Sequence, residues 1–168
     1  ELIAYTFHHL YGLNTTGLRF FTVYGPRGRP DMAPYMFIDR VFRGATIDQY
    51  GDGTTSRDYT YISDIVAGII AAVDRPLGYQ IFNLGNGRPY PLNAFIQLVE
   101  TEVGKAANIR VLPEQPGDVK HTCADISKAQ ALLDYNPQVP FEQGIALTVE
   151  WFRDARRSGL LPGDAGDA

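Results

Sequence analysis

The sequence has very little cysteine and no long apolar run, and both absences narrow the class of protein. Its single cysteine, Cys123, excludes an intrachain disulfide framework and leads us to expect a reducing, cytoplasmic compartment. The longest apolar stretch, Ile65 to Val73, has nine residues, whereas a membrane-spanning helix needs about 20. The sequence therefore predicts neither a disulfide-stapled domain nor a membrane-embedded segment.

An excess of basic charge is also missing. The chain carries 15 Lys and Arg against 19 Asp and Glu, a formal net charge of -4, so we expect no nucleic-acid partner. With 168 residues, of which 45% are hydrophobic and 12% aromatic, the composition is that of a globular chain able to bury a core without cross-links.

Most catalytic and cofactor motifs are missing as well. No G-x-G-x-x-G follows a strand pattern, and there is no G-x-x-x-x-G-K-[ST] and no G-x-S-x-G, so neither a phosphate-binding loop nor a serine nucleophile is predicted. His8 and His9 are adjacent and point to different faces of a helix, so we expect one half-buried and one solvated histidine and no metal site. We expect Cys123 to be a small buried hydrophobic residue.

What the sequence does contain is an alternation of helix and strand patterns, which predicts an α/β fold. Ser63 and Asn93 are predicted to cap helices, and Ser127 with Gln130 to form a capping box. Helices are expected over 1–11, 35–42, 63–73, 93–103, 127–135 and 141–152, strands over 15–21, 47–50, 57–62, 80–84 and 109–112, and a loop over 22–34.

The first helix pattern has an unusual position in the chain. Ile3, Phe7, Leu10 and Tyr11 form one apolar face, yet no capping residue precedes Glu1. Two interpretations stay open at this point: a chain cut inside a longer helix, or a frayed first helix of a complete small protein.

Polar residues gather in three loops that are rich in glycine or proline. Arg27, Arg29 and Asp31 lie in the first loop, Arg57-Asp58 follows the second, and Asp118 lies in the third. Guanidinium groups bind phosphate in a bidentate manner, an Asp carboxylate can accept both ribose hydroxyls, and Tyr50 could face a base. Each residue taken singly is more simply a solvated ion-pair member; the three loops together weakly favour a nucleotide-diphosphate site.

Three strings make the sequence similar to a known family. They are L-R-F-F-T-V-Y-G-P from Leu18, R-P-D-M-A from Arg29 and S-R-D-Y-T-Y-I-S-D from Ser56, followed in order by N-L-G-N from Asn83 and Q-P-G-D-V from Gln115. Together they resemble the NAD-dependent sugar-nucleotide epimerase/dehydratase family (extended short-chain dehydrogenases), and within it the UDP-glucuronate 4-epimerases. The resemblance extends to about Arg157.

The resemblance implies that the chain is part of a larger enzyme. The family's catalytic Tyr-x-x-x-Lys lies on a helix that leads into a segment similar to E-L-I-A-Y-T-F, and no tyrosine here has a lysine four residues later. We therefore expect residues 1–157 to be a C-terminal half, the last part of a Rossmann sheet plus the smaller sugar-nucleotide-binding lobe, and 158–168 to be a flexible tail. The Tyr, the Lys and most of the NAD site would lie upstream of Glu1. The fragment would be inactive alone, and its parent would be a homodimer.

The resemblance also assigns candidate site residues. Phe21 matches a position whose backbone lies near the nicotinamide, and Thr22 stands where UDP-galactose-type epimerases have Asn, so that its hydroxyl could donate to a glucuronyl carboxylate. The remaining matches are Arg29, Asp31 and Met32 in a loop that closes on the diphosphate and uridine, Gln49 and Tyr50 in a strand against uracil, Arg57 on the diphosphate, and Asp118 on the ribose.

One matched position departs from the family pattern. Gln115 stands where many relatives have a second phosphate-binding Arg, which leaves Arg57 and Arg29 to neutralise the phosphates.

The chemistry implied for the parent enzyme is C4 epimerisation of UDP-glucuronate to UDP-galacturonate through a 4-keto intermediate, with NAD taking and returning the hydride. Thr22 would hold the carboxylate in a plane that suppresses loss of CO2. Three alternatives remain open. The first is another sugar-nucleotide epimerase, dehydratase or decarboxylase, for which Thr22 and Arg29 discriminate. The others are a non-catalytic nucleotide-sugar-binding or regulatory module and a plain structural or interaction domain.

Overall fold

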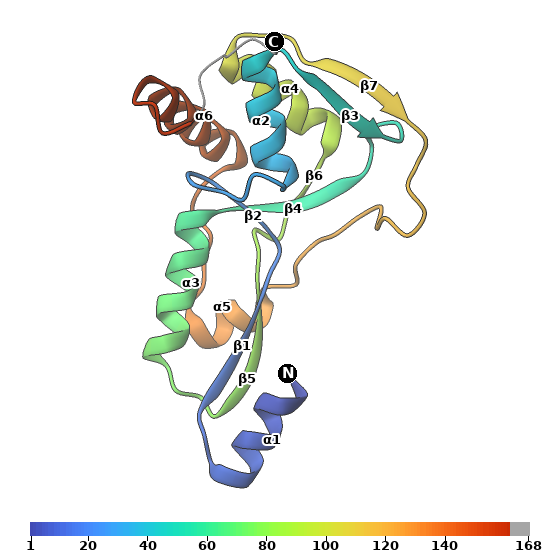
Figure 1. Cartoon of the computed structure of the whole chain (residues 1–168). Coiled ribbons are helices and arrows are strands. Elements are labelled where there is room, and N and C mark those ends of the chain that lie inside the picture. The colour runs from blue at the N-terminus through green and yellow to red at the C-terminus, as the bar shows by residue number, and fades with distance from the viewer. Residues whose placement is uncertain (162–168) are drawn as a thin grey trace. The chain divides into compact units, whose positions relative to one another are not determined.

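The computed structural model describes residues 1–161 as alternating helices and strands (Figure 1). In chain order these are α1 Leu2–Tyr11, β1 Thr15–Phe20, β2 Thr22–Tyr24, α2 Ala33–Arg43, β3 Thr46–Tyr50, β4 Ser56–Tyr61, α3 Ile62–Asp74, β5 Tyr79–Leu84, β6 Pro89–Pro91, α4 Leu92–Val103, β7 Asn108–Leu112, α5 Ser127–Leu133 and α6 Phe141–Arg157. The predicted α/β class is confirmed.

The chain divides into two compact units. The first unit comprises Glu1–Val23, Asp58–Pro89 and Thr122–Val139, and the second comprises Tyr24–Arg57, Tyr90–His121 and Pro140–Ala168.

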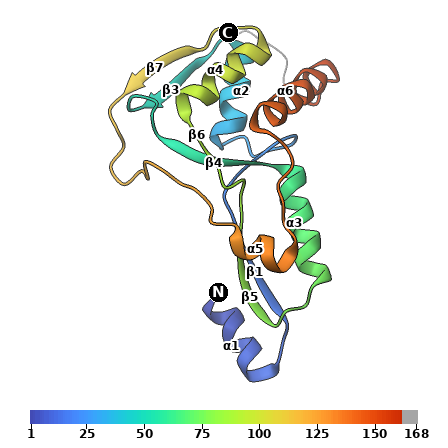
Figure 2. The same ribbon diagram turned by 180° about the vertical axis from the view of Figure 1, so that it is seen from behind.

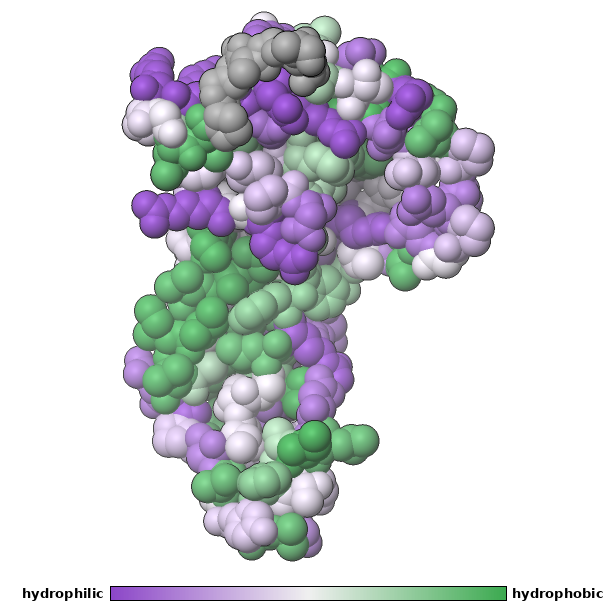
Figure 3. Space-filling model, in the orientation of Figure 1, coloured by the Kyte–Doolittle hydropathy of each residue, from purple (hydrophilic) through white to green (hydrophobic). Residues whose placement is uncertain are grey.

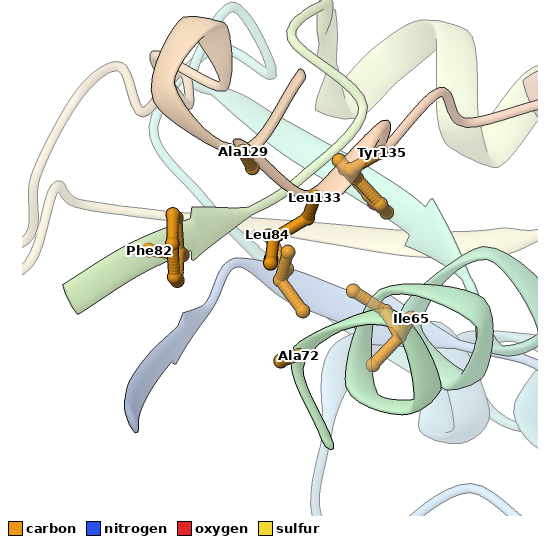
Figure 4. Close-up of a cluster of buried hydrophobic side chains, with 7 residues drawn as sticks. All are labelled: Ile65, Ala72, Phe82, Leu84, Ala129, Leu133 and Tyr135. Carbon is orange, nitrogen blue, oxygen red and sulfur yellow. The ribbon is translucent and has the colours of Figure 1, made fainter. Parts of the chain in front are cut away.

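The first unit is built on a parallel pair of strands, β1 and β5, with Leu18 opposite Phe82 and Phe20 opposite Leu84. Successive strand side chains point to opposite faces, so Phe82 and Leu84 share the face covered by α3 and α5 (Figure 4). Tyr79 belongs to the other face, where its ring meets that of Tyr5 from α1 at 5.2 Å. The result is a helix, sheet, helix arrangement.

The core of the first unit lies on the α3 and α5 side of this strand pair. It consists of Ile65, Ala72, Phe82, Leu84, Ala129, Leu133 and Tyr135. Gly68 lets α3 approach the strands closely, because a Cβ there would lie 2.8 Å from a methyl group of Leu84. Position 68 of α3 therefore has no space for a side chain larger than the hydrogen of glycine.

The second unit is built on another parallel strand pair, β3 and β7, beside helices α2 and α4 (Figures 1 and 2). Its core is aromatic: the ring of Phe95 lies 5.8 Å from Phe37 and 6.0 Å from Phe141, and Tyr35 lies 4.7 Å from Phe152. Stacked and tilted rings of this kind bury large areas, so α2, α4 and α6 form the support on which the loops of this unit rest.

The strands β2 and β6 were not predicted. Each has three residues and joins a three-stranded sheet of order β2-β4-β6. The sequence predicts a loop from residue 22 onward because three prolines follow, and β6 itself begins and ends in proline. Such short strands have no period of their own, so only pairing with β4 reveals them.

The predicted helix caps are wrong at all three positions. Residues Tyr61, Pro91 and Ile126 occupy the N-cap positions of α3, α4 and α5, and none of them makes a side-chain capping bond. Ser63 and Asn93 lie inside the first turns instead. At α5 the backbone N–H of Ser127 donates to Asp125 Oδ1 at 3.0 Å, so the polar group lies two residues earlier than predicted.

The exposure of the two adjacent histidines agrees with the sequence prediction, whereas that of the cysteine does not. His8 is half-buried and His9 exposed, as predicted. Cys123 is exposed, which contradicts the expectation of a buried residue; its neighbour Ala124 is the buried one, because alternate residues of an extended segment face opposite ways.

The C-terminal segment was expected to be a tail, and no membrane-spanning helix was predicted. Of the expected tail, residues 158–161 form a turn and bend after α6, and residues 162–168 lie outside the described residues. No helix of residues 1–161 has both the length and the apolar character needed to cross a membrane.

Candidate functional site

A small surface pocket in the second unit brings together several predicted binding residues. It has a volume of about 20 Å³ and is lined by Tyr50, Thr55, Glu114, Gln115, Asp118 and Lys120. Tyr50 ends β3, and the other residues come from the loops on either side of β4 and β7. Tyr50, Gln115 and Asp118 are therefore neighbours although more than 60 residues separate the first from the others.

Arg57 forms a close charge contact beside this pocket. Its Nη2 donates to Asp118 Oδ1 at 2.7 Å, and its Nη1 donates to the backbone oxygens of Ser56 at 3.0 Å and Lys120 at 3.4 Å. The Arg57 side chain is only 25% exposed, so the guanidinium is held in one place. One side of the guanidinium is bound to protein oxygens, and an incoming anion would compete with Asp118 for the other.

The pairing of β4 with the segment after β7 explains this meeting. Ser56 forms an isolated parallel bridge with His121, and its N–H donates to Lys120 O at 2.8 Å. The Ser56 hydroxyl also lies 2.9 Å from His121 Nδ1. These contacts fix residues 118–121 alongside Arg57.

The turn after β3 fixes the position of Tyr50. Gly51 and Gly53 both have positive φ, 76° and 81°, which other residues rarely adopt. Between them, Asp52 Oδ1 accepts from both the backbone N–H and the hydroxyl of Thr54, at 2.9 and 2.6 Å, and these bonds lower the pKa of Asp52.

Gln49 and Tyr50 differ in what they can offer a ligand. The Gln49 side chain is buried, and its Nε2 donates to Gly51 O at 3.1 Å. Tyr50 is 38% exposed at the pocket. Tyr50 can thus present a ring to a flat ligand, whereas Gln49 can contribute through its backbone.

The loop of Arg29, Asp31 and Met32 is a separate feature of the same unit. Arg29 Nη2 lies 2.5 Å from Asp31 Oδ2, and this exposed pair raises the pKa of Arg29 and lowers that of Asp31. Met32 occupies the N-cap position of α2. The contacts that the structure records for these three residues lie within the loop and α2, so it does not bring them to the pocket.

Phe21 and Thr22 belong to the first unit. The backbone N–H of Phe21 donates to Leu84 O at 3.1 Å, which continues the β1-β5 pairing by one residue. Thr22 begins β2 and is half-buried. Both residues therefore lie at the carboxyl end of β1, where parallel sheets usually present binding residues.

Asp58, the neighbour of Arg57, is not available to a ribose. It is fully buried, and its Oδ1 accepts from Asn86 N at 2.8 Å while its Oδ2 accepts from Gly87 N and Ala124 N, both at 2.9 Å. Asp58 thus anchors two loops. Gly85 makes room for this contact, since a Cβ there would lie 2.4 Å from that of Ala124.

Three pocket residues were missed by sequence reasoning: Thr55, Glu114 and Lys120. Lys120 Nζ lies 3.1 Å from Glu114 Oε1, and both side chains are more than half exposed. Lys120 adds a positive charge to the same pocket as Gln115, the residue that stands where many relatives have a second phosphate-binding Arg. The sequence could have indicated Lys120 only through its position two residues after Asp118. The contact between Ser56 and His121 that aligns Lys120 with Arg57 joins residues 65 positions apart.

Comparison with known proteins identifies the family of this chain. The model of the "NAD dependent epimerase/dehydratase family" matches residues 1–85, just over half of the chain. The chain belongs to this family. Among curated family members, the UDP-glucuronate 4-epimerase of Thermodesulfobacterium geofontis is 48% identical over 155 residues, which are 92% of this chain and 48% of that protein. A probable UDP-glucuronate 4-epimerase of Rhizobium meliloti is 40% identical over 90% of this chain and 50% of its own length.

Solved structures of family members share the fold. The UDP-glucuronic acid 4-epimerase of Bacillus cereus, in complex with UDP-glucuronic acid and NAD, is 34% identical with a TM-score of 0.85, over 91% of this chain and 49% of that one. The UDP-glucose 4-epimerase of Thermotoga maritima, solved with UDP-glucose, is also 34% identical, with a TM-score of 0.86 over 92% and 50%. The chain thus spans about half the length of the relatives that it matches.

Proposed function

We propose that this chain is the substrate-binding half of an NAD-dependent UDP-sugar 4-epimerase, and that the sugar nucleotide is UDP-glucuronate. The support is twofold: relatives named UDP-glucuronate 4-epimerase and probable UDP-glucuronate 4-epimerase are 48% and 40% identical over nine-tenths of the chain, and one unit gathers Tyr50, Gln115 and Asp118 around one small surface pocket.

The observation that carries the proposal is the Arg57–Asp118 pair at the pocket lined by Tyr50. In this reading Arg57 binds the diphosphate, Asp118 turns to accept the ribose hydroxyls, and the Tyr50 ring faces the uracil. The ion pair keeps both groups in place before the ligand arrives, and the ligand exchanges one set of charge-assisted bonds for another.

In this proposal Lys120 supplies the positive charge that Gln115 lacks. An ammonium on a flexible stem binds phosphate as a point charge, and Lys120 can swing from Glu114 toward the pocket because both side chains are exposed. We therefore assign Lys120 the second positive charge on the diphosphate. Arg29, paired with Asp31 in its own loop, supplies a third only if that loop closes.

The choice of glucuronate rests on Thr22. A hydroxyl at the carboxyl end of β1 can donate to the C6 carboxylate of the sugar. By fixing the plane of that carboxylate, Thr22 would keep a 4-keto intermediate from losing CO2. Replacing Thr22 with Val should weaken binding of UDP-glucuronate but not that of UDP-glucose, which has no carboxylate.

The described helices lack one feature of a dinucleotide-binding fingerprint. The described helices begin after Glu1, Met32, Tyr61, Pro91, Ile126 and Pro140, and none of these N-cap residues is a glycine that would let a pyrophosphate approach the helix end. We propose that NAD and the catalytic Tyr and Lys are held by the part of the relatives that this chain does not match, that Phe21 lies next to the nicotinamide, and that the parent enzyme is a homodimer.

Calorimetry on this chain tests the proposal without the rest of the enzyme. UDP should bind, UMP should bind more weakly, and Arg57→Gln should reduce UDP affinity at least tenfold, because a hydrogen bond to a charged group contributes about 1.5–3 kcal/mol. Lys120→Gln should reduce it several-fold. Matched controls are Arg110→Gln, which removes an exposed cation paired with Asp48, and Lys105→Gln, whose Nζ bonds to Phe42 O.

The outcomes separate the candidate functions. Absence of UDP binding, or equal losses in the Arg57 and Arg110 variants, would contradict the proposed site. Equal affinity for UDP-glucuronate and UDP-glucose in both wild type and Thr22→Val would favour an epimerase for another sugar. A binding module is indicated if the chain, reconstituted with the unmatched part of the Thermodesulfobacterium geofontis enzyme, binds the sugar nucleotide but does not epimerise it.

A further inference from the structure

The second unit contains a larger pocket, which shares no lining residue with the pocket beside Arg57. It has a volume of about 250 Å³ and is lined by side chains of β6, α4 and the first turn of α6. Its apolar wall includes Tyr90, Leu98 and Phe141, and the rings of Tyr90 and Phe141 stack with their centroids 4.2 Å apart. Phe141 is only 2% exposed, so the core of the unit holds this wall in place.

The polar side chains of the pocket offer hydrogen-bond acceptors. They are Gln97, Thr101 and Glu142. The Thr101 hydroxyl donates its hydrogen to the backbone oxygen of Gln97 at 2.9 Å, which leaves its lone pairs able to accept. Glu142 is exposed in the first turn of α6, and within residues 1–161 its carboxylate has no hydrogen-bond or ion-pair partner. An ionised carboxylate only accepts, so this rim favours a ligand that brings donors.

The charges around the pocket favour a cation over an anion. Helix α4 contains Glu100 and Glu102 and no Lys, Arg or His, and the first basic residue of α6 is Arg153. The beginning of a helix usually favours an anion, but here an anion would meet the carboxylate of Glu142. A cation would instead find that carboxylate and the ring of Tyr90, whose π electrons attract positive charge.

We propose that this pocket binds a small organic cation, a protonated primary amine joined by a short chain to a ring. The ring packs between Leu98 and the stacked pair of Tyr90 and Phe141, and the ammonium group donates to Glu142 and Thr101. The volume lies below the range of about 300–1,000 Å³ for drug-sized ligands, which suits a single ring. This site is independent of the proposed nucleotide site, because the two pockets have no lining residue in common.

Nuclear magnetic resonance on the isotope-labelled full chain tests the proposal, with phenethylamine as the probe at neutral pH. Phenethyl alcohol and phenylpropionate are the uncharged and the anionic controls, since each carries the same ring on a short chain. We expect the amide signals of Gln97, Thr101 and Glu142 to shift saturably with the amine. Its affinity should be about fivefold higher than that of the alcohol, the upper range for an exposed ion pair, and phenylpropionate should cause no saturable shift.

Apolar side chains that gather over α3 in the first unit provide an internal control (Figure 3). Four residues of α3 are exposed and apolar: Ile62, Val66, Ile70 and Val73. A probe that is attracted only by apolar surface would shift the amides of α3 as well. We therefore expect the α3 signals to stay in place while those of the pocket move.

Three variants test the position of the cation. Glu142→Gln should lower the affinity for the amine about fivefold and leave that for the alcohol unchanged. Thr101→Lys places an ammonium group of the chain itself at the rim, so it should weaken binding of the amine. Both positions are exposed, so each variant should keep the wild-type melting temperature. Glu150→Gln is the matched control, because Glu150 is an exposed glutamate of α6 that does not line the pocket.

Four results would overturn the proposal. The first is the absence of a saturable shift with phenethylamine, and the second is equal affinity for the amine, the alcohol and the acid. The third is a loss of amine affinity in Glu142→Gln no greater than in Glu150→Gln. The fourth is a set of shifts confined to α3, which would place the probe on the apolar face of the first unit.

Discussion

Replacing Asp58 with Asn should destabilise the first unit far more than a change of one atom suggests. The buried carboxylate accepts three backbone N–H groups at 2.8–2.9 Å and the Thr60 hydroxyl at 3.2 Å. In Asp58→Asn one oxygen becomes an NH2 group, so at least one backbone N–H loses its acceptor and faces another donor.

The magnitude follows from the number of bonds lost. A hydrogen bond to a charged group contributes about 1.5–3 kcal/mol, and an unsatisfied buried N–H costs a further 1–3 or so. We expect Asp58→Asn to lower the free energy of unfolding by about 3–5 kcal/mol, against a typical total of about 5–15 kcal/mol. Thr60→Val, which removes one hydroxyl and leaves the three backbone bonds, should cost only about 1 kcal/mol.

Hydrogen exchange and urea unfolding measure these effects at two levels. In Asp58→Asn the amides of Asn86, Gly87 and Ala124 should exchange at least a hundredfold faster, while amides of β3 and α4 in the other unit change little. A variant that unfolds within about 1 kcal/mol of wild type, with unchanged exchange at these three amides, would refute the view that Asp58 anchors the loops.

Three further predictions concern other parts of the chain. Gly144→Ala should destabilise by about 1–3 kcal/mol despite the higher helix propensity of Ala, since a Cβ there would lie 2.0 Å from the Tyr24 hydroxyl; an unchanged melting temperature would contradict this packing. Hydrogen bonding to Arg110 lowers the pKa of Asp48 below its ordinary value of 3.8. The contribution of this pair to the free energy of unfolding is therefore complete above that pH and is lost as the pH falls through the lower folded-state pKa. Asp48→Asn should reduce the loss of stability at acid pH, and an unchanged acid limb of the stability profile would argue against the pair. Cys123 should react with a thiol reagent in the native chain as fast as in urea, because its side chain is exposed, and strong native protection would show that it is buried.

The alternation of helix and strand was readable from the sequence because it depends on local periodicity. The apolar positions of α6, at residues 141, 145, 149 and 152, all proved to be buried. The caps were not readable, because Ser63 and Asn93 are good capping residues that lie two positions too late. Helices α3 and α4 begin directly after β4 and β6, so the pairing of these strands, and not a local capping signal, sets where the helices start.

The candidate site shows the same division between local and long-range information. Tyr50, Arg57 and Asp118 could be named from their motifs, but their meeting depends on the bridge between Ser56 and His121. No periodicity encodes that bridge. Asp58 has the same residue type as Asp118, and only burial distinguishes an anchor of loops from a group that can reach a ligand.

The alternation of side chains along β4 has a consequence for how this site can vary. Arg57 and Asp58 are consecutive, one partly exposed beside the pocket and the other fully buried. Inserting or deleting a single residue before them would exchange their environments, moving the guanidinium to the buried position beside the backbone N–H groups of Asn86, Gly87 and Ala124 and the carboxylate to the partly exposed position beside the pocket. Both folding and ligand binding would fail together, so length changes in this strand should be far less tolerated than substitutions, and natural variation in loop length should be confined to the turns on either side.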